Sequence, residues 1–239
     1  MGTLYIVATP IGNLEDITLR AIRILGEVDY VLCEDTRVTG KLLSHYDIKT
    51  TMKRYDAHTS EKVHEAILTD LGEGKNIALV SDAGTPGVSD PGVMLVSRAR
   101  IAGARIDVIP GASAVTAAFS IAGIVGNQFT FLGFVPQKKG GETFLKSLAT
   151  FPQPTIFFES THRILKTLEA LVKTNPEGKV VLARELTKLH EEMLVGTPTE
   201  LLNILTEEPV KQKGEFVVIL QTGGQNLPKD RTNSDISSE

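Results

Sequence analysis

The alternation of short apolar runs with segments of helical periodicity is the feature that most constrains the fold of this 239-residue chain. The apolar runs have strand length and lie at Leu4–Ala8, Val28–Cys33, Ile77–Ser81, Arg105–Ile109, Thr155–Glu159, Val180–Ala183, Met193–Gly196 and Phe216–Gln221. Helical patterns fall between many of them, as at Thr36–His45, Ser60–Leu71 and His162–Lys173. Strands that alternate with helices pair in parallel beneath those helices. The pattern therefore predicts an α/β protein with a mainly parallel sheet.

The number of elements fits two small α/β domains, which we place at residues 1–112 and 113–222. Residues 223–239 are polar and lack periodicity, so we expect a disordered tail. A helix is expected to start at Asp90-Pro91, with Pro91 in its first position. Residues 136–141 are expected to form a polar, mobile loop.

Charge and cysteine content exclude several classes of protein. The chain has 25 Lys+Arg against 29 Asp+Glu, a net charge of -4, so bulk positive charge does not hold it on nucleic acid. A local basic patch stays compatible with this balance. The single cysteine, Cys33, excludes an internal disulfide and a cysteine-cluster zinc site, and it favours the cytoplasm. The five histidines are scattered, so no metal site is predicted, and no apolar run approaches the roughly 20 residues of a membrane span.

Three turns rich in glycine, proline and small residues follow strands of the first half. They are Ala8–Leu14, Ser81–Gly92 and Pro110–Ala114, and the second holds three Gly and two Pro in twelve residues. Open α/β sheets bind ligands at the carboxyl ends of their strands, and such turns bring bare backbone close to a ligand. The second turn is neither a Walker A loop nor G-x-G-x-x-G. A nucleoside-like ligand or ordinary turns are both compatible with these residues.

Two charged segments also follow strands, Glu34–Arg37 and Arg184–Glu192. Dense charge after an apolar strand suits the wall of an active site, and it suits a solvated face as well. The residue types alone leave both interpretations open.

Seven segments together resemble the ribosomal RNA small-subunit methyltransferase I family of the tetrapyrrole-methylase superfamily, in order and at the family's spacing. They are Ala8–Leu14, Glu34–Arg37, Ser81–Gly92, Pro110–Ala114, Glu159–Arg163, Arg184–Glu192 and Gly214–Val218, within a resemblance that spans about residues 3–222. The resemblance implies two α/β domains with S-adenosylmethionine in the cleft between them, usually in a homodimer. It also implies 2′-O-methylation of a cytidine in the decoding region of 16S rRNA. One departure is Thr161, because the family usually reads Ser-Pro-His-Arg where this chain has Ser-Thr-His-Arg.

With this resemblance, the three turns and the end of a second-domain strand become the expected cofactor site. Its predicted residues are Pro10, Gly12, Asp82, Thr85, Ser113, Ala114, Phe158 and Glu159. Methyl transfer from a sulfonium needs alignment of the two reactants and no metal.

The predicted catalytic residues are Lys188, Glu185 and Arg184. Lys188 would lower the pKa of the ribose hydroxyl, or act as a base if its own pKa is depressed. Glu185 would orient Lys188 or accept the proton, and Arg184 would hold the adjacent phosphate by a two-pronged contact. The alternative is a surface network of charges, with positioning alone driving the reaction.

The expected partner is 16S rRNA within the assembled small ribosomal subunit. Basic residues that could contact its phosphates concentrate in the second half of the chain: Lys138, Lys139, Lys146, Arg163, Lys166, Arg184, Lys188, Lys211 and Lys213. The Phe-rich segment Gln128–Val135 would cover either the interface of a homodimer or a core. Two other functions stay open, a methylase of tetrapyrroles or diphthamide precursors and a cofactor- or RNA-binding module without catalysis.

Overall fold

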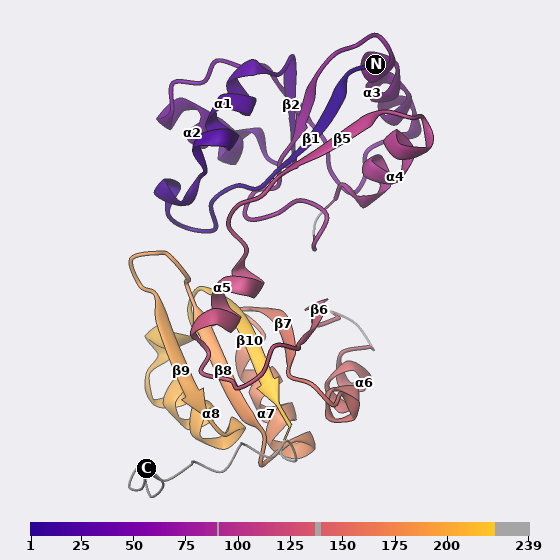
Figure 1. Ribbon diagram of the computed structural model, residues 1–239. Helices are drawn as coiled ribbons and strands as arrows, with labels where there is room; N and C mark the ends of the chain where they lie inside the picture. The colour runs from indigo at the N-terminus through magenta and orange to yellow at the C-terminus, as the bar shows by residue number, and fades with distance from the viewer. Residues whose placement is uncertain (90, 137–139, 223–239) are drawn as a thin grey trace, which may run out of the picture. The chain divides into compact units, whose positions relative to one another are not determined.

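The computed structural model describes residues 1–89, 91–136 and 140–222. The chain divides into two compact units, Met1–Ala117 and Ala118–Glu239 (Figure 1). The expected tail at 223–239 lies outside the described residues, as do Asp90, Lys138 and Lys139.

The first unit is built on a five-stranded sheet in which every pair of neighbours is parallel. The strand order is β3-β2-β4-β1-β5. The strands are β1 (Thr3–Val7), β2 (Tyr30–Cys33), β3 (Met52–Arg54), β4 (Ile77–Leu79) and β5 (Arg105–Ile109). The helices are the 3-10 turn η1 (Leu14–Asp16) and the α-helices α1 (Leu19–Glu27), α2 (Thr36–His45), α3 (Glu61–Gly72) and α4 (Val93–Ile101).

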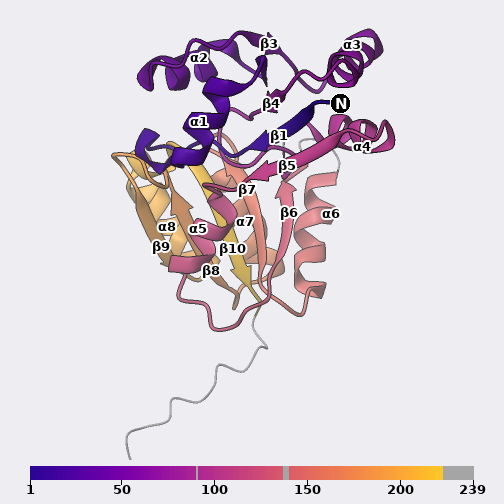
Figure 2. The same cartoon turned by 45° about the horizontal axis from the view of Figure 1, so that its top comes forward.

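Helices cover both faces of this sheet, with α1 and α2 on one side and α3 and α4 on the other (Figures 1 and 2). Leu25 of α1 and Leu43 of α2 pack with Val31 in one buried cluster. Leu71 of α3 and Leu95 of α4 belong to a second cluster. A sheet that is buried on both faces needs apolar residues at successive positions, which explains the continuous apolar runs of the sequence.

The second unit is built on a mixed sheet with the order β6-β7-β10-β8-β9. Its strands are β6 (Thr130–Phe134), β7 (Thr155–Ser160), β8 (Lys179–Arg184), β9 (Glu192–Gly196) and β10 (Glu215–Gln221). Its helices are α6 (Gly140–Ser147), η2 (Leu148–Thr150), α7 (Ile164–Thr174), α8 (Pro198–Glu207) and η3 (Pro209–Gln212), and α5 (Ala114–Ile121) spans the limit between the units. Only β6 and β7 pair in parallel, while β7, β10, β8 and β9 pair antiparallel in that order.

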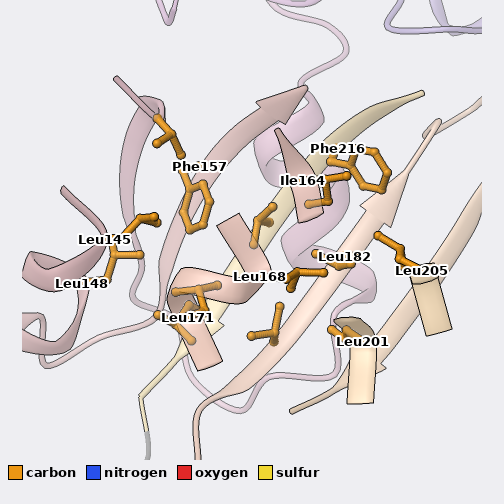
Figure 3. Close-up of a cluster of buried hydrophobic side chains, with 14 residues drawn as sticks. Leu145, Leu148, Phe157, Ile164, Leu168, Leu171, Leu182, Leu201, Leu205 and Phe216 are labelled. Carbon is orange, nitrogen blue, oxygen red and sulfur yellow. The ribbon is translucent and has the colours of Figure 1, made fainter. Parts of the chain in front are cut away.

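The core of the second unit lies between its sheet and helices α6, α7 and α8. Figure 3 shows Leu168 of α7 and Leu201 of α8 among the side chains that face Phe157 and Leu182 of the strands. The residues that alternate with these strand positions, such as Val181 and Ile219, are fully buried too. The central strands of this sheet are therefore buried on both faces, and α5 lies over the face opposite α7 in Figures 1 and 2.

The α/β class is confirmed, but three details predicted from the sequence are wrong. The mainly parallel sheet holds only for the first unit, because hairpin and return connections in the second unit reverse the strands. Helix α4 begins at Val93 instead of Pro91, since Gly92 between them has a φ of 140°, which lies outside the helical region. Strand β3 and helix α6 were not expected, and α6 begins within the segment that was predicted to be a loop.

Candidate active site

The carboxyl ends of β1 and β4 form a topological switch point in the first unit. These strands are neighbours in the sheet, yet the helix after β1 packs on one face and the helix after β4 packs on the other. The chain therefore leaves the two strands in opposite directions, which opens the sheet edge at the position where α/β proteins bind ligands. Both loops at this point are glycine- and proline-containing turns that the sequence singled out.

The two loops are joined by backbone and hydroxyl hydrogen bonds. The Thr9 N–H donates to the Gly84 carbonyl at 2.9 Å, and the Gly84 N–H donates to the Thr9 carbonyl at 3.1 Å. The Thr9 hydroxyl donates to the Ser81 carbonyl at 3.0 Å. Gly84 has a φ of 80°, a conformation that glycine adopts without strain. This part of the sheet edge is therefore held in place before any ligand binds.

The predicted cofactor residues of the first unit gather at this edge. Pro10 follows Thr9, and Asp82 follows Ser81. The Thr85 hydroxyl donates to the Ala112 carbonyl at 3.3 Å, which ties the loop after β4 to the turn before Ser113 and Ala114. Asp82 and Gly12 are exposed, while Thr85, Ser113 and Ala114 are half-buried.

The charged segment after β2 adjoins the same edge. Asp35 is the N-cap of α2, and its carboxylate accepts from the Arg37 backbone at 2.8 Å and from the Arg37 guanidinium. These hydrogen bonds hold the pKa of Asp35 well below its usual range. The Asp35 N–H donates to the Asp82 carboxylate at 3.2 Å, so this segment positions one of the predicted cofactor residues.

In the second unit, the ends of two neighbouring strands bring Glu185, Lys188 and Glu215 together. Glu185 follows β8, Glu215 begins β10, and antiparallel pairing puts these two ends at one edge of the sheet. The Lys188 ammonium lies 2.9 Å from Glu185 Oε1 and 2.8 Å from Glu215 Oε2. Glu185 Oε1 also accepts from the Glu215 N–H at 2.9 Å, and the Glu185 N–H donates to the Glu215 carbonyl at 3.0 Å.

This arrangement decides the charge state of Lys188. Burial by itself disfavours the ammonium, but the hydrogen bonds that Lys188 donates to Glu215 and Glu185 outweigh it and raise the pKa of Lys188. Burial also opposes the charge of Glu185, and hydrogen bonds from Lys188 and the Glu215 backbone outweigh it and lower the pKa of Glu185. Lys188 is therefore a cation at neutral pH. Its predicted role as a base requires a depressed pKa, so the geometry favours the electrostatic role.

Arg184 belongs to a separate network of charges. Its guanidinium lies 3.1 Å from Glu192 Oε2 and donates to the Lys213 carbonyl at 3.0 Å. Glu192 in turn contacts Lys211 at 3.0 Å, and Lys211 contacts Glu208 at 3.1 Å. Arg184 is buried, and its hydrogen bonds join β8, β9 and the turn before β10.

The two predicted cofactor residues of β7 point to opposite faces of the sheet. The Glu159 carboxylate is buried against α7, where it contacts Arg163 at 2.8 Å and accepts from the Thr167 hydroxyl at 2.7 Å and the Ser160 N–H at 2.7 Å. Phe158 is half-buried and packs with aromatic rings of β6, at 5.0 Å from Phe131. Glu159 thus stabilises the start of α7, and of these two residues Phe158 is the one whose side chain lies on the other face of the sheet.

Several residues of these two sites were not singled out one by one from the sequence. The segments that carry the family resemblance include Thr9, Ser81 and Glu215. The sequence therefore identified these segments as parts of a site, but it did not predict the contacts that the three residues make. Thr161 was marked only as a departure from the family pattern. Hydrogen bonds between residues 53 to 75 positions apart leave no periodic signal in a sequence.

Among residues 1–89, 91–136 and 140–222, no three His, Cys, Asp or Glu side chains lie where they could hold a metal ion. Within the same ranges, no helix has both the length and the apolar character that crossing a bilayer requires.

Comparison with known proteins gives the family. The model of the Tetrapyrrole (Corrin/Porphyrin) Methylases matches residues 3–202. A ribosomal RNA small subunit methyltransferase I from Haemophilus influenzae is 44% identical over 100% of this chain and 83% of its own. A protein of the same name from Thermotoga maritima is 44% identical over 92% of this chain and 98% of its own.

Solved structures show the same fold at low identity. A diphthine synthase has a TM-score of 0.72 at 15% identity, over 93% of this chain and 90% of its own. A uroporphyrin-III C-methyltransferase from Thermus thermophilus, solved in complex with S-adenosylhomocysteine, has a TM-score of 0.64 at 21% identity, over 92% of this chain and 97% of its own. The sheets, the switch point and these matches agree. The chain belongs to the tetrapyrrole methylases and, among them, to the family of the ribosomal RNA small subunit methyltransferases I.

Proposed function

We propose that this protein uses S-adenosylmethionine to methylate the RNA of the small ribosomal subunit. The observation that carries the proposal is the identity of 44% with a ribosomal RNA small subunit methyltransferase I along the whole chain. At the finer level we propose that the acceptor is the ribose 2′-hydroxyl of a cytidine in the decoding region of 16S rRNA. The substrate is the assembled subunit, and the enzyme acts in the cytoplasm.

The cofactor chemistry fits the edge of the first sheet. The exposed Asp82 carboxylate suits the amino or ribose hydroxyl groups of the cofactor, and the exposed Gly12 allows its close approach. Ser113 and Ala114 are small enough to leave room for a flat ring. In this proposal Pro10 and Thr85 shape the same edge. Of the two β7 residues expected from the sequence, the half-buried Phe158 stays a candidate, while the Glu159 carboxylate is already matched by partners on α7 and at its start.

The reaction is a displacement at a methyl carbon. The cofactor supplies a methyl group on a positively charged sulfur, and that sulfur keeps the electron pair of the broken S–C bond. The ribose oxygen forms the new O–C bond and its proton leaves to solvent. A protonated Lys188 favours that loss, because a nearby cation stabilises the negative charge that develops on the oxygen. An ammonium has three N–H donors, and Glu185 and Glu215 account for two of them.

Glu185 and Arg184 have supporting roles in this proposal. Glu185 keeps Lys188 charged and holds its side chain in one place. Arg184 is tied to Glu192, so a phosphate contact requires it to share its guanidinium with that carboxylate. Exposed lysines of the second unit, such as Lys146 and Lys166, are further candidates for phosphate contacts.

The test is methyl transfer to small ribosomal subunits from a strain that lacks this enzyme. Nucleosides from the treated 16S rRNA are separated and identified by mass spectrometry, and we expect one new 2′-O-methylcytidine. Methylation of a base would overturn the proposal that the acceptor is a ribose 2′-hydroxyl. No transfer to RNA would overturn the proposal that the protein methylates ribosomal RNA. Transfer to a tetrapyrrole or to a diphthamide precursor would favour the related methylases, and cofactor binding without any transfer would favour a binding module.

Two sets of variants assign the residues. Asp82→Asn is expected to weaken S-adenosylmethionine binding in calorimetry, while the rate at saturating cofactor changes less.

Lys188→Ala is expected to lower the transfer rate roughly a hundredfold with cofactor binding intact. Rates within a few-fold of the parent for Lys188→Ala and Glu185→Ala would instead support a mechanism of positioning alone.

A further inference from the structure

Glu185, which holds Lys188, stands in an unusual backbone conformation. Its φ is 51°, in the left-handed region that residues other than glycine seldom adopt. Such a conformation is strained and persists only where the surroundings enforce it. The turn after β8 must therefore be held from outside, and the turn before β10 is the part of the chain that it contacts.

Gly214 provides the space that Glu185 occupies. A Cβ atom on Gly214 would lie 2.5 Å from Glu185 Cγ, closer than real Cβ atoms approach their neighbours, and 2.8 Å from Glu185 Cδ. Gly214 itself has a φ of 109°, which a residue with a side chain rarely adopts. The Glu185 side chain thus lies directly against the bare backbone of Gly214.

Thr161 fixes the backbone of Gly214 by two hydrogen bonds. The Thr161 hydroxyl donates to the Gly214 carbonyl at 2.7 Å and accepts from the Gly214 N–H at 2.9 Å. One hydroxyl therefore satisfies both polar groups of a single glycine. Thr161 directly follows β7, which neighbours β10 in the sheet, so the contact links the third strand end of this edge to the other two.

We propose that Thr161 and Gly214 are positioning residues, which set the place of Glu185 and through it the place of Lys188. The proposal rests on the role of Lys188 proposed above. Three successive contacts connect these residues. The Thr161 hydroxyl binds the Gly214 backbone, the Gly214 backbone packs against the Glu185 side chain, and the Glu185 carboxylate binds the Lys188 ammonium.

The experiment compares Thr161→Val, which removes the hydroxyl at nearly constant shape, with Thr161→Ser, which keeps it. Thr174→Val is the matched control, because the Thr174 hydroxyl also makes two hydrogen bonds, to the Ala170 carbonyl and from the Asn175 amide, within and next to α7. Gly214→Ala displaces Glu185 by a different route and serves if Thr161→Val does not fold. Each variant is measured for thermal unfolding, for kcat and KM, and for the pKa of Lys188.

The pKa of Lys188 is read by NMR on protein labelled at lysine Cε, with the signal assigned from Lys188→Arg. The charged groups around this ammonium are Glu185 and Glu215, with Arg184 next to Glu185. We expect Thr161→Val and Gly214→Ala to lower the pKa of Lys188 by about half a unit or more and kcat roughly tenfold, with KM for the cofactor unchanged. Thr161→Ser and Thr174→Val are expected to keep the parental pKa of Lys188 and the parental kcat.

The outcomes separate this proposal from the one on which it rests. A lower Lys188 pKa with a parental kcat would support the positioning role and overturn the catalytic role of Lys188. An unchanged Lys188 pKa in Thr161→Val and Gly214→Ala would overturn the positioning role, whatever happens to kcat or to the unfolding temperature.

Discussion

Two carboxylates of the second unit illustrate how the surroundings of a single residue decide its use. Glu159 has no exposed side-chain surface, and its charge is matched by Arg163 and by two neutral donors. Glu185 is partly exposed and shares Lys188 with Glu215, whose side chain is 80% exposed. The buried Glu159, whose charge and hydrogen bonds are satisfied within the protein, stabilises the fold. Lys188 lies between two carboxylates but is partly exposed, so it can still contact a substrate.

Replacement of Glu159 by glutamine is expected to destabilise the second unit. The amide keeps the shape but removes the negative charge beside Arg163, which leaves a partly buried guanidinium without its ionic partner. We expect a loss of about 1–3 kcal/mol in the free energy of unfolding, measured in urea. Glu169→Gln on the exposed face of α7 is the control and should stay within about 0.5 kcal/mol of the parent. Equal stability of the two variants would contradict the structural role of Glu159.

Replacement of Lys188 by methionine is expected to change the pH dependence of stability. The pKa of Glu185 is lowered in the folded state, so its ion pair stabilises the protein above the unfolded pKa of about 4.3 and is lost as pH falls through the folded pKa. The pKa of Lys188 is raised, so its contribution is complete below about 10.4 and is lost as pH rises through the folded pKa. The difference between parent and variant should thus be about 1 kcal/mol at pH 7 and shrink near pH 3.

Urea unfolding at the two pH values measures this difference. Lys166→Met, at an exposed position of α7, is the control for the general loss of a positive charge. A difference that is the same at pH 3 and pH 7 would show that Lys188 does not stabilise the fold through its carboxylate partners.

At the scale of elements, helix ends depend on a few side chains. Helix α8 begins with a capping box, in which the Thr197 hydroxyl accepts from the Glu200 N–H and the Glu200 carboxylate accepts from the Thr197 N–H at 2.7 Å. Helix α7 has no side-chain cap at Arg163, and Glu159 of the preceding strand binds its first turn instead.

Thr197→Ala is expected to lower the free energy of unfolding by about 1 kcal/mol, because the Glu200 N–H in the first turn of α8 loses its acceptor. Thr199→Ala changes the same residue type on the exposed side of the first turn, where no cap is lost, and should be nearly neutral. Thermal and urea unfolding of both variants measure the effect. A neutral Thr197→Ala would mean that water replaces the cap without cost.

At the scale of the whole molecule, each unit has its own sheet and its own core. We expect two such chains to associate, as the family resemblance implies. The Phe-rich segment partly supports this, because β6 is an edge strand whose Phe134 is 55% exposed while Phe131 packs on Phe158. Exposed aromatic side chains at an edge strand are suited to an interface.

Light scattering at micromolar concentration is expected to give about 52 kDa, twice the chain mass of 25.9 kDa. Phe134→Ser should favour the monomer if this edge forms the interface, and Val210→Ser, another exposed apolar position, is the control. A parent that scatters as a single chain would contradict the homodimer.

The α/β class and most elements were predictable from the sequence, because periodicity reports which residues are buried. Helix α2 was predicted with its observed limits, and β5 likewise. Helix α6 was missed because it begins with two glycines, which are typical of loops, although its Leu145 packs in the core. The direction of β8, β9 and β10 was missed because a strand has the same pattern of buried residues in either direction.

For the candidate site, the sequence by itself determined where polar residues and turns follow strands, and through its motifs it determined the family. The contacts that give those residues their chemical state were decided only by the tertiary structure. Lys188 is held between Glu185, three residues before it, and Glu215, which approaches only because β10 pairs with β8. A pKa depends on charges and solvent within a few ångströms, and strand pairing decides which distant residues come that close.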